Sequence, residues 1–295
     1  MMEHLDPEQA AIQRLKMAAE LSEKYYQEPM TVCYSGGKDS EVLLELCRRA
    51  EVPYHVVHNL TTADAPETIY HVRKVFYRLE LAGISCTISK PFYRGQRTSM
   101  WQLIPLKGIA PTRRVRYCCQ VLKETNNQHR CAILGVRKLE SSARSDSAVA
   151  ELPGRNRSER ITFDMDNGDT RIIAPCQMKA TIKIHPIVDW TDAQVWQFLR
   201  DAKVDINPVY GMGFNRVGCV GCPMAGKNRY TEFQRWPKYE MLYRRAFARM
   251  VEARRSLGKD GPWNSADEVF RWWMEDKNLD GQMDIFGGEV GEFEP

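Results

Sequence analysis

The strongest constraint on the fold of this chain is an alternation of strand patterns with helical patterns in its first half. Residues 30–35, 53–60, 85–90 and 130–136 are rich in β-branched and other apolar residues, which predicts four strands. Helical patterns, in which apolar residues recur every three or four positions, precede the first strand and follow the first and second strands. This alternation predicts an α/β fold with a doubly wound, mainly parallel sheet.

After the fourth strand pattern the chain changes character twice. Residues 145–184 are rich in Ser, Arg, Asp and Gly, and they predict a surface insertion or a small hairpin. Helical patterns with many aromatic residues return beyond residue 228. We therefore expect an α/β domain over residues 1–228, with an N-terminal helix, and a helical C-terminal extension over residues 229–295.

Composition narrows the class of protein. The chain has 295 residues, of which 27% are charged and 43% hydrophobic, an ordinary globular balance. It contains no apolar run of membrane-spanning length and no signal-peptide pattern, so we expect a cytoplasmic protein without a membrane partner. Residues 90–160 carry 15 Lys or Arg against 5 Asp or Glu. This local excess suits a polyanion, either nucleotide phosphates or a nucleic-acid backbone.

One hexapeptide between a predicted strand and a predicted helix has the properties of a phosphate-binding loop. It consists of Ser35, Gly36, Gly37, Lys38, Asp39 and Ser40. The glycines permit a tight turn that aims backbone N–H groups outward, and the helix that follows adds a partial positive charge. The lysine supplies a full charge, and the serine hydroxyls can donate to phosphate oxygens. The alternative is an ordinary helix cap with a glycine turn.

Two further loops should lie at the same edge of the sheet. Asp64, after the second strand, is a candidate to meet a nucleotide or its Mg²⁺, although such an aspartate often only forms a turn. Gly135 and Arg137 follow the fourth strand, and Arg144 lies seven residues further on. Arginines at this position can clamp phosphate or sulfate with two hydrogen bonds. The alternative is a solvated basic loop.

Four of the nine cysteines stand in pairs. Cys118 and Cys119 are adjacent, and Cys219 and Cys222 form a CxxC motif. Two such pairs can supply four ligands to one metal centre, which is either an iron–sulfur cluster or zinc. The alternative is a set of small buried residues with a coincidental CxxC.

These motifs together resemble the adenine-nucleotide α-hydrolases, and within them the phosphoadenosine phosphosulfate reductase family. The resemblance rests on the hexapeptide and on four later blocks, at residues 61–68, 133–144, 185–196 and 207–224. It implies a loop that holds adenine nucleotides, and in ATP-using members cleavage between the α and β phosphates. It further implies catalytic roles for Lys38, Asp39 and Arg137. The cysteine pairs are similar to the 4Fe-4S site of the assimilatory adenylylsulfate reductases.

This sequence lacks one cysteine that the sulfonucleotide reductases use in catalysis. The sulfonucleotide reductases carry a catalytic cysteine near the C-terminus, whereas Cys222 is the last cysteine of this sequence. We therefore expect an adenylating ATP pyrophosphatase with an iron–sulfur cluster, similar to ATP-using sulfur-transfer enzymes such as those of DNA phosphorothioation. Its expected partners are a DNA or tRNA acceptor and a sulfur donor protein. The alternatives are a phosphosulfate reductase that uses an external thiol and a nucleotide-sensing regulator that binds DNA.

The stretch at residues 229–255 mixes Arg and Lys with aromatic residues. Such a mixture is typical either of a nucleic-acid surface or of an amphipathic helix that packs its rings inward. We expect the packing role here.

Overall fold

The computed structural model describes residues 6–124, 130–140, 144–152, 161–163, 181–259 and 261–275. The chain forms two compact units. The first comprises the described residues of Met1–Arg97 and Cys119–Cys219, and the second those of Thr98–Cys118 and Val220–Pro295.

The first unit is built on a seven-stranded sheet with the strand order β3-β2-β1-β6-β9-β7-β8. Its five parallel strands are β3 (Cys86–Ser89), β2 (Tyr54–Asn59), β1 (Met30–Cys33), β6 (Cys131–Ile133) and β9 (Ile182–Ile184). The antiparallel edge consists of β7 (Ala150–Leu152) and β8 (Ile161–Phe163). The expected α/β sheet and its four strands are thus confirmed, and β9 is a fifth parallel strand that the sequence did not predict.

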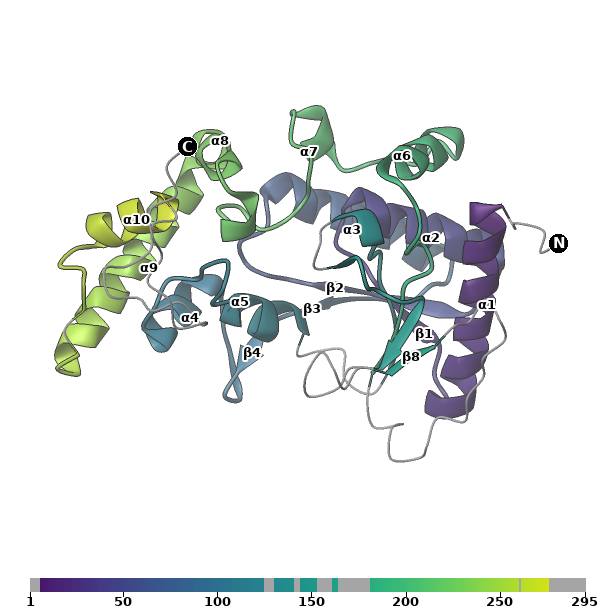
Figure 1. Ribbon diagram of the computed structural model, residues 1–295, viewed down its shortest axis with the longest axis horizontal. Coiled ribbons are helices and arrows are strands. Elements are labelled where there is room, and N and C mark those ends of the chain that lie inside the picture. The colour runs from purple at the N-terminus through teal and green to yellow at the C-terminus, as the bar shows by residue number, and fades with distance from the viewer. Residues whose placement is uncertain are drawn as a thin grey trace. The chain divides into compact units, whose positions relative to one another are not determined.

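The helices of this unit flank the sheet. They are α1 (Pro7–Tyr26), α2 (Lys38–Ala50), α3 (Pro66–Leu81), α6 (Asp192–Asp201) and the short α7 (Pro208–Gly211). Helix α2 packs against both α1 and α6, and Figure 1 shows α2 and α3 along the same side of the strands. Apolar side chains of α1 and α2 fill the core with those of β1, among them Leu15, Leu43 and Val32.

Part of the predicted insertion at residues 145–184 joins the main sheet. Strand β7 pairs antiparallel with β9 on one side and with β8 on the other. The side chains of β7 are buried. The hairpin is therefore an extension of the sheet rather than a separate surface element, and residues 153–160 and 164–180 of the predicted insertion lie outside the described residues.

Two small elements of the first unit follow β3. A hairpin consists of β4 (Phe92–Tyr93) and β5 (Gln96–Arg97), and it forms a sheet of its own. The π-helix Gln120–Glu124 contacts β4.

The second unit is helical. It contains α4 (Met100–Lys107), α8 (Asn228–Arg235), α9 (Pro237–Ser256) and α10 (Ala266–Glu275). Helix α4 packs along α9, where the Trp101 ring meets Tyr243 edge-on at 4.9 Å. The sequence places residues 98–118 and 220–228 in one α/β domain, whereas the structure groups them with the C-terminal helices. Trp101 packs on Tyr243, and the Tyr243 hydroxyl donates to the carbonyl of Val220 at 3.1 Å.

The basic and aromatic stretch at 229–255 folds as α8 and α9, divided at Pro237 because proline fits the first turn of a new helix. Its rings Phe233, Tyr243 and Phe247 are buried, which agrees with the expected packing role. No helix that the structure describes combines the length and the apolar character of a membrane span.

Candidate functional site

The candidate site lies where the sheet changes direction. Strands β2 and β3 continue the sheet on one side of β1, while β6 continues it on the other. The loops that leave β1 and β6 therefore lie at the carboxyl ends of neighbouring strands at the point where the strand order reverses, which is where open α/β sheets bind ligands. The predicted phosphate loop follows β1, and the loop of Gly135 and Arg137 follows β6.

The phosphate loop turns sharply before α2. Gly36 has a φ of +75°, and a Cβ there would lie 3.3 Å from methyl carbons of both Thr68 and Val72 on α3. A side chain at this position would be strained in its backbone and crowded by its neighbours. Gly37 is the N-cap of α2 and has an extended conformation, so the amide end of the helix begins at this loop.

The two serine hydroxyls fix the shape of this loop. The Ser40 hydroxyl donates to the carbonyl of Gly37 at 2.7 Å and lies 3.2 Å from the Ser35 hydroxyl. The Ser35 hydroxyl in turn accepts from the N–H of Gly37 at 3.3 Å. Both serines therefore hold the loop in a set conformation before any ligand is present.

Two side chains from the α7 region contact the same loop. Asn207 donates through Nδ2 to the carbonyl of Gly36 at 2.9 Å and to the hydroxyl of Thr68 at 3.2 Å. The Tyr210 hydroxyl accepts from the backbone N–H of Lys38 at 2.9 Å. Burial raises the pKa of Tyr210 to about 12, so this hydroxyl stays protonated at neutral pH.

Four charged side chains meet in front of the loop. Arg137 donates from Nε to Asp39 at 2.7 Å and from a terminal nitrogen to Asp192 at 2.9 Å. The Lys38 ammonium lies 3.3 Å from the Asp39 carboxylate and 3.2 Å from that of Asp192. The structure thus brings together the three predicted catalytic residues, with Asp192 as a fourth member.

The charges of this group differ in exposure. Only 3% of the Arg137 side chain is exposed, against 61% for Asp192. Partial burial acts to raise the pKa of Asp192, but the hydrogen bond and charge of Lys38, together with Arg137, outweigh it and hold that pKa below its ordinary value. Asp192 is therefore a carboxylate at neutral pH, held by two cations and open to solvent.

Gly135 permits the close approach of the two loops. A Cβ on Gly135 would lie 2.9 Å from the Cβ of Asp39 and 3.1 Å from its carbonyl carbon, which is closer than real side chains come. Arg144 pairs with Glu140, and Glu140 also accepts from the backbone N–H of Arg137 at 3.3 Å. Arg144 is therefore linked to Arg137 indirectly, because Glu140 contacts both residues.

Asp64 has a turn-forming position. Its carboxylate accepts from the backbone N–H of Thr61 at 2.8 Å, and its backbone forms an isolated bridge with Cys219. The Cys219 thiol is buried and donates to the Thr61 hydroxyl at 3.3 Å. The structure thus gives Asp64 the structural role that the sequence left as the alternative, and its contact with a nucleotide or Mg²⁺ stays a prediction.

The predicted four-cysteine metal site receives no support from the structure. Cys119 and Cys219 belong to the first unit, and Cys118 and Cys222 to the second. Among the described residues, no three side chains of His, Cys, Asp or Glu form a group that could hold a metal ion.

Three residues at the loop were missed by sequence reasoning. Asp192 directly follows Thr191, the N-cap of α6, so the sequence signal indicated only a helix start. Asn207 and Tyr210 lie in the block 207–224, in which only the cysteines were assigned a function, as metal ligands. Their contacts with Gly36 and Lys38 span about 170 positions and leave no local signature.

The chain is similar to several known proteins. The phosphoadenosine phosphosulfate reductase domain matches residues 29–225. An uncharacterised protein of Methanocaldococcus jannaschii is 26% identical over 91% of this chain and 58% of its own length. The adenosine 5'-phosphosulfate reductase of Allochromatium vinosum is 27% identical over 64% of this chain and 66% of its own length.

The chain thus spans less than two thirds of each of these two relatives. Among solved structures, the phosphoadenylyl-sulfate reductase of Candida auris covers 74% of this chain, and this chain covers 96% of that one, at 17% identity and a TM-score of 0.45. The family match covers most of the chain, including both loops of the site. The chain belongs to the phosphoadenosine phosphosulfate reductase domain family.

Proposed function

We propose that this protein binds ATP with its Mg²⁺ on the loop 35–40 and cleaves it between the α and β phosphates. An acceptor oxygen attacks the α phosphorus, the bond to the bridging oxygen breaks, and pyrophosphate leaves with that oxygen and its negative charge. The product is an adenylated acceptor. The acceptor proton passes to solvent or to a neighbouring base.

The observation that carries this proposal is the mixed charge in front of the loop. Lys38 and Arg137 provide two cations for phosphate oxygens, while Asp39 and Asp192 provide two carboxylates. A bare nucleotide anion would be repelled by these carboxylates. A magnesium-bound triphosphate suits both the cations and the carboxylates of this group. The cations face phosphate oxygens, and Mg²⁺ is usually held by one or two carboxylates together with phosphates and water.

The chain's own residues would supply electrostatic stabilisation of the reaction. The first amides of α2 and the Lys38 ammonium would stabilise the charge that develops on the leaving pyrophosphate. Asp39 holds Arg137 in place through a 2.7 Å hydrogen bond, so the guanidinium needs no reorganisation when the ligand binds. Preorganised charge of this kind is usually the largest catalytic contribution.

The test is pyrophosphate release from MgATP by the whole protein, with and without tRNA and DNA as acceptors. Lys38→Ala should lower kcat/KM by about 100-fold or more, by analogy with the removal of one transition-state donor. Lys138→Ala is the matched control, because Lys138 pairs with Asp189 outside the charged group. Release of ADP and phosphate instead, or turnover that survives Lys38→Ala, would overturn the proposal.

The names of several relatives make adenosine 5'-phosphosulfate the competing substrate. Binding of MgATP and of phosphosulfate should therefore be compared by calorimetry, with and without Mg²⁺. Magnesium-dependent binding of ATP that weakens in Asp192→Asn, but not in Asp201→Asn on the same helix, supports our assignment. Magnesium-independent preference for the phosphosulfate, with release of sulfite and AMP when a thiol is added as the reductant, would assign a reductase.

Sulfur transfer onto the adenylated acceptor and a 4Fe-4S cluster remain proposals drawn from the sequence. They are tested by iron and sulfide analysis of anaerobically purified protein and of a Cys219→Ser, Cys222→Ser variant. Four iron and four sulfide ions per chain, lost in the variant, would support the cluster. Stoichiometric zinc or an absence of metal would remove it, without affecting the nucleotide site.

A further inference from the structure

We infer that the β4–β5 hairpin is a contact surface for single-stranded nucleic acid, on which Phe92 stacks on a base while Arg94 and Arg97 meet phosphates. The hairpin contributes no residue to the nucleotide site described above. The inference is independent of the proposed function, because binding to the hairpin requires no turnover of ATP.

The geometry of the hairpin presents these side chains rigidly. Arg94 and Gly95 connect its strands with φ values of 51° and 77°. Positive φ at both central residues is typical of the type I′ turn, which matches the twist of a two-residue hairpin. In the register, Phe92 pairs with Arg97 and Tyr93 with Gln96. Cross-strand neighbours share a face, so the Phe92 ring and the Arg97 guanidinium stand side by side.

The exposure of these residues leaves them accessible to a ligand. Phe92 is 49% exposed, and Arg94 and Arg97 are exposed as well. The Arg94 guanidinium lies 5.3 Å from the centre of the Tyr93 ring. A single exposed ring is common on protein surfaces. Its combination with flanking cations on a preorganised turn is what single-stranded nucleic acids require, since each base offers a face to stack and each linkage a charge to neutralise.

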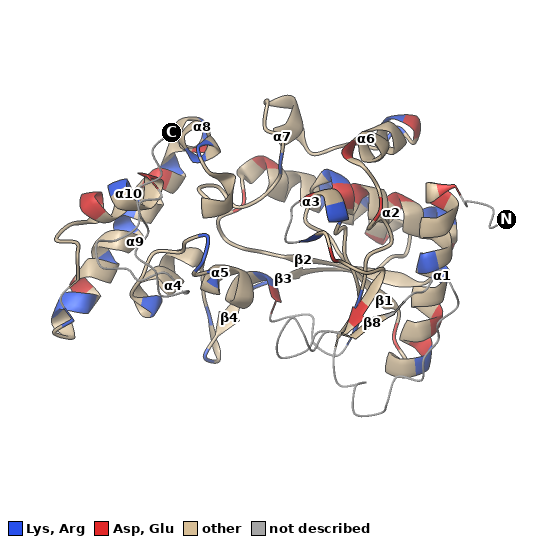
Figure 2. Ribbon diagram, viewed as in Figure 1, with Lys and Arg blue, Asp and Glu red and all other residues tan. Residues whose placement is uncertain are grey.

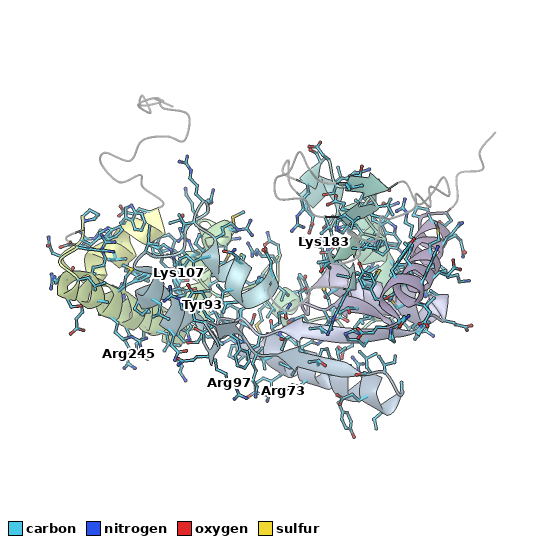
Figure 3. The ribbon with its side chains drawn as sticks, turned by 90° about the horizontal axis from the view of Figure 1, so that it is seen from below. Arg73, Tyr93, Arg97, Lys107, Lys183 and Arg245 are labelled. Carbon is cyan, nitrogen blue, oxygen red and sulfur yellow. The ribbon has the colours of Figure 1, made fainter. Side chains whose placement is uncertain are left out.

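The charge around the hairpin favours a polyanion. Residues 81–97, which include the hairpin and belong to the first unit, contain three Lys or Arg and no Asp or Glu. In the part of the chain that the structure describes, no carboxylate forms an ion pair with Lys90, Arg94 or Arg97. Figure 2 shows blue and no red on this hairpin, and Figure 3 labels Tyr93 and Arg97 on it.

The basic and aromatic segment at residues 229–255 differs from the hairpin, because its arginines contact other groups of the second unit. On α9, Arg244 is paired with Glu240 and Asp267 and lies 3.9 Å from the centre of the Phe270 ring. Arg254 donates to the carbonyl of Gly108 at 2.9 Å. These arginines of the second unit are engaged in its packing, whereas those of the hairpin are not neutralised. The hairpin is therefore the better candidate for a nucleic-acid contact.

The test is fluorescence anisotropy of labelled RNA and DNA single strands of about 16 nucleotides, titrated with the full chain without ATP. Phe92→Ala should weaken binding by about 5-fold or more, the range expected for loss of one stacked base. Arg97→Ala should reduce the slope of log K against log salt by about 0.7, one phosphate contact. The separate titrations with RNA and with DNA show which of these two nucleic acids the hairpin binds more tightly.

Matched controls lie elsewhere on the first unit. Tyr70→Ala removes an exposed ring from α3, and Arg48→Ala removes an exposed arginine from α2. Both should bind within about 2-fold of the wild type, with salt slopes unchanged within error. Unchanged binding in Phe92→Ala and Arg97→Ala would overturn the inference, and so would failure of the wild type to bind at low salt. Equal competition by polyglutamate would assign the surface to an acidic protein instead.

Discussion

The hydroxyl of Tyr210 accepts a hydrogen bond from the backbone N–H of Lys38, at 2.9 Å. This N–H is the first amide of α2 and belongs to the positive end of the helix, where a phosphate oxygen would bind. The Tyr210 ring is held edge-on against Trp196, with 5.1 Å between the ring centres. A side chain from α7 thus occupies a donor of the phosphate loop.

Tyr210→Phe should therefore tighten the binding of pyrophosphate and ATP. Loss of the hydroxyl removes a competitor for the Lys38 amide, and one neutral hydrogen bond of about 1 kcal/mol corresponds to roughly a 5-fold lower Kd. Calorimetric titration with pyrophosphate measures the change. Trp196→Phe is the control, since it alters the ring packing but keeps the hydroxyl. Weaker binding by Tyr210→Phe would mean that the hydroxyl bonds to the ligand itself.

The two carboxylates that hold Arg137 should contribute unequally to stability. Asp39→Ala leaves a buried guanidinium without its 2.7 Å partner and should cost roughly 2–3 kcal/mol of unfolding free energy. Asp192→Ala removes a carboxylate whose side chain is 61% exposed, so its cost should stay below about 1 kcal/mol. Urea denaturation of both variants measures the difference. Equal losses would contradict the unequal burial.

Gly135→Ala should damage both stability and nucleotide binding. The new Cβ would lie 2.9 Å from the Cβ of Asp39, so the start of α2 would have to shift, at a cost of about 1–3 kcal/mol. Gly211→Ala is the matched control, because nothing lies within 4 Å of a Cβ there. Thermal unfolding and ATP titration check both variants. If Gly135→Ala had the Tm and the ATP affinity of the wild type, the two loops would be able to move apart at little cost.

Acid should destabilise the fold through two buried histidines. Burial lowers the pKa of His58 and of His185 below the ordinary value of 6.5. The unfolded chain then binds more protons than the folded one, so the free energy of unfolding falls as pH decreases from about 6.5 through the lowered folded pKa values. The nitrogen Nδ1 of each ring lies within 3.0 Å of a backbone carbonyl, of Tyr34 and of Ala148 respectively.

This pH dependence can be measured as Tm at about pH 7.5 and about pH 5.5, on either side of the ordinary histidine pKa. The wild type should melt at a lower temperature in acid. A His58→Asn, His185→Asn variant keeps an amide donor near each carbonyl but no longer titrates, so the difference between the two pH values should shrink. An equal Tm for the wild type at both pH values would contradict the assignment.

The sequence was sufficient for the elements whose patterns are local. The strands β1, β2, β3 and β6 are short segments rich in β-branched and other apolar residues, and the helices α2 and α3 carry apolar residues at helical spacing. Strand β9 escaped prediction because its three residues, Ile-Lys-Ile, are too few to establish a period. Helix α4 escaped because Pro105 interrupts it and because its apolar residues follow no clear stripe.

At the site, residues within one loop were predictable and residues that meet across the fold were not. The glycines, serines and Lys38 of the hexapeptide are adjacent in sequence, and their shared chemistry indicates phosphate. Asp192 and Tyr210 reach the same place from α6 and α7. A helix-start aspartate and a half-buried tyrosine occur in most proteins, so only the folded arrangement reveals their relation to the loop.

The long separation between the loop and its partners has a consequence for biosynthesis. The asparagine that holds the carbonyl of Gly36 lies 171 positions downstream, and the arginine that meets Asp39 lies 98 positions downstream. During translation, the loop is made long before these partners leave the ribosome. Ligand affinity should therefore appear abruptly, once the chain through α7 has emerged, and ATP in the cell would stabilise only chains that have completed this assembly.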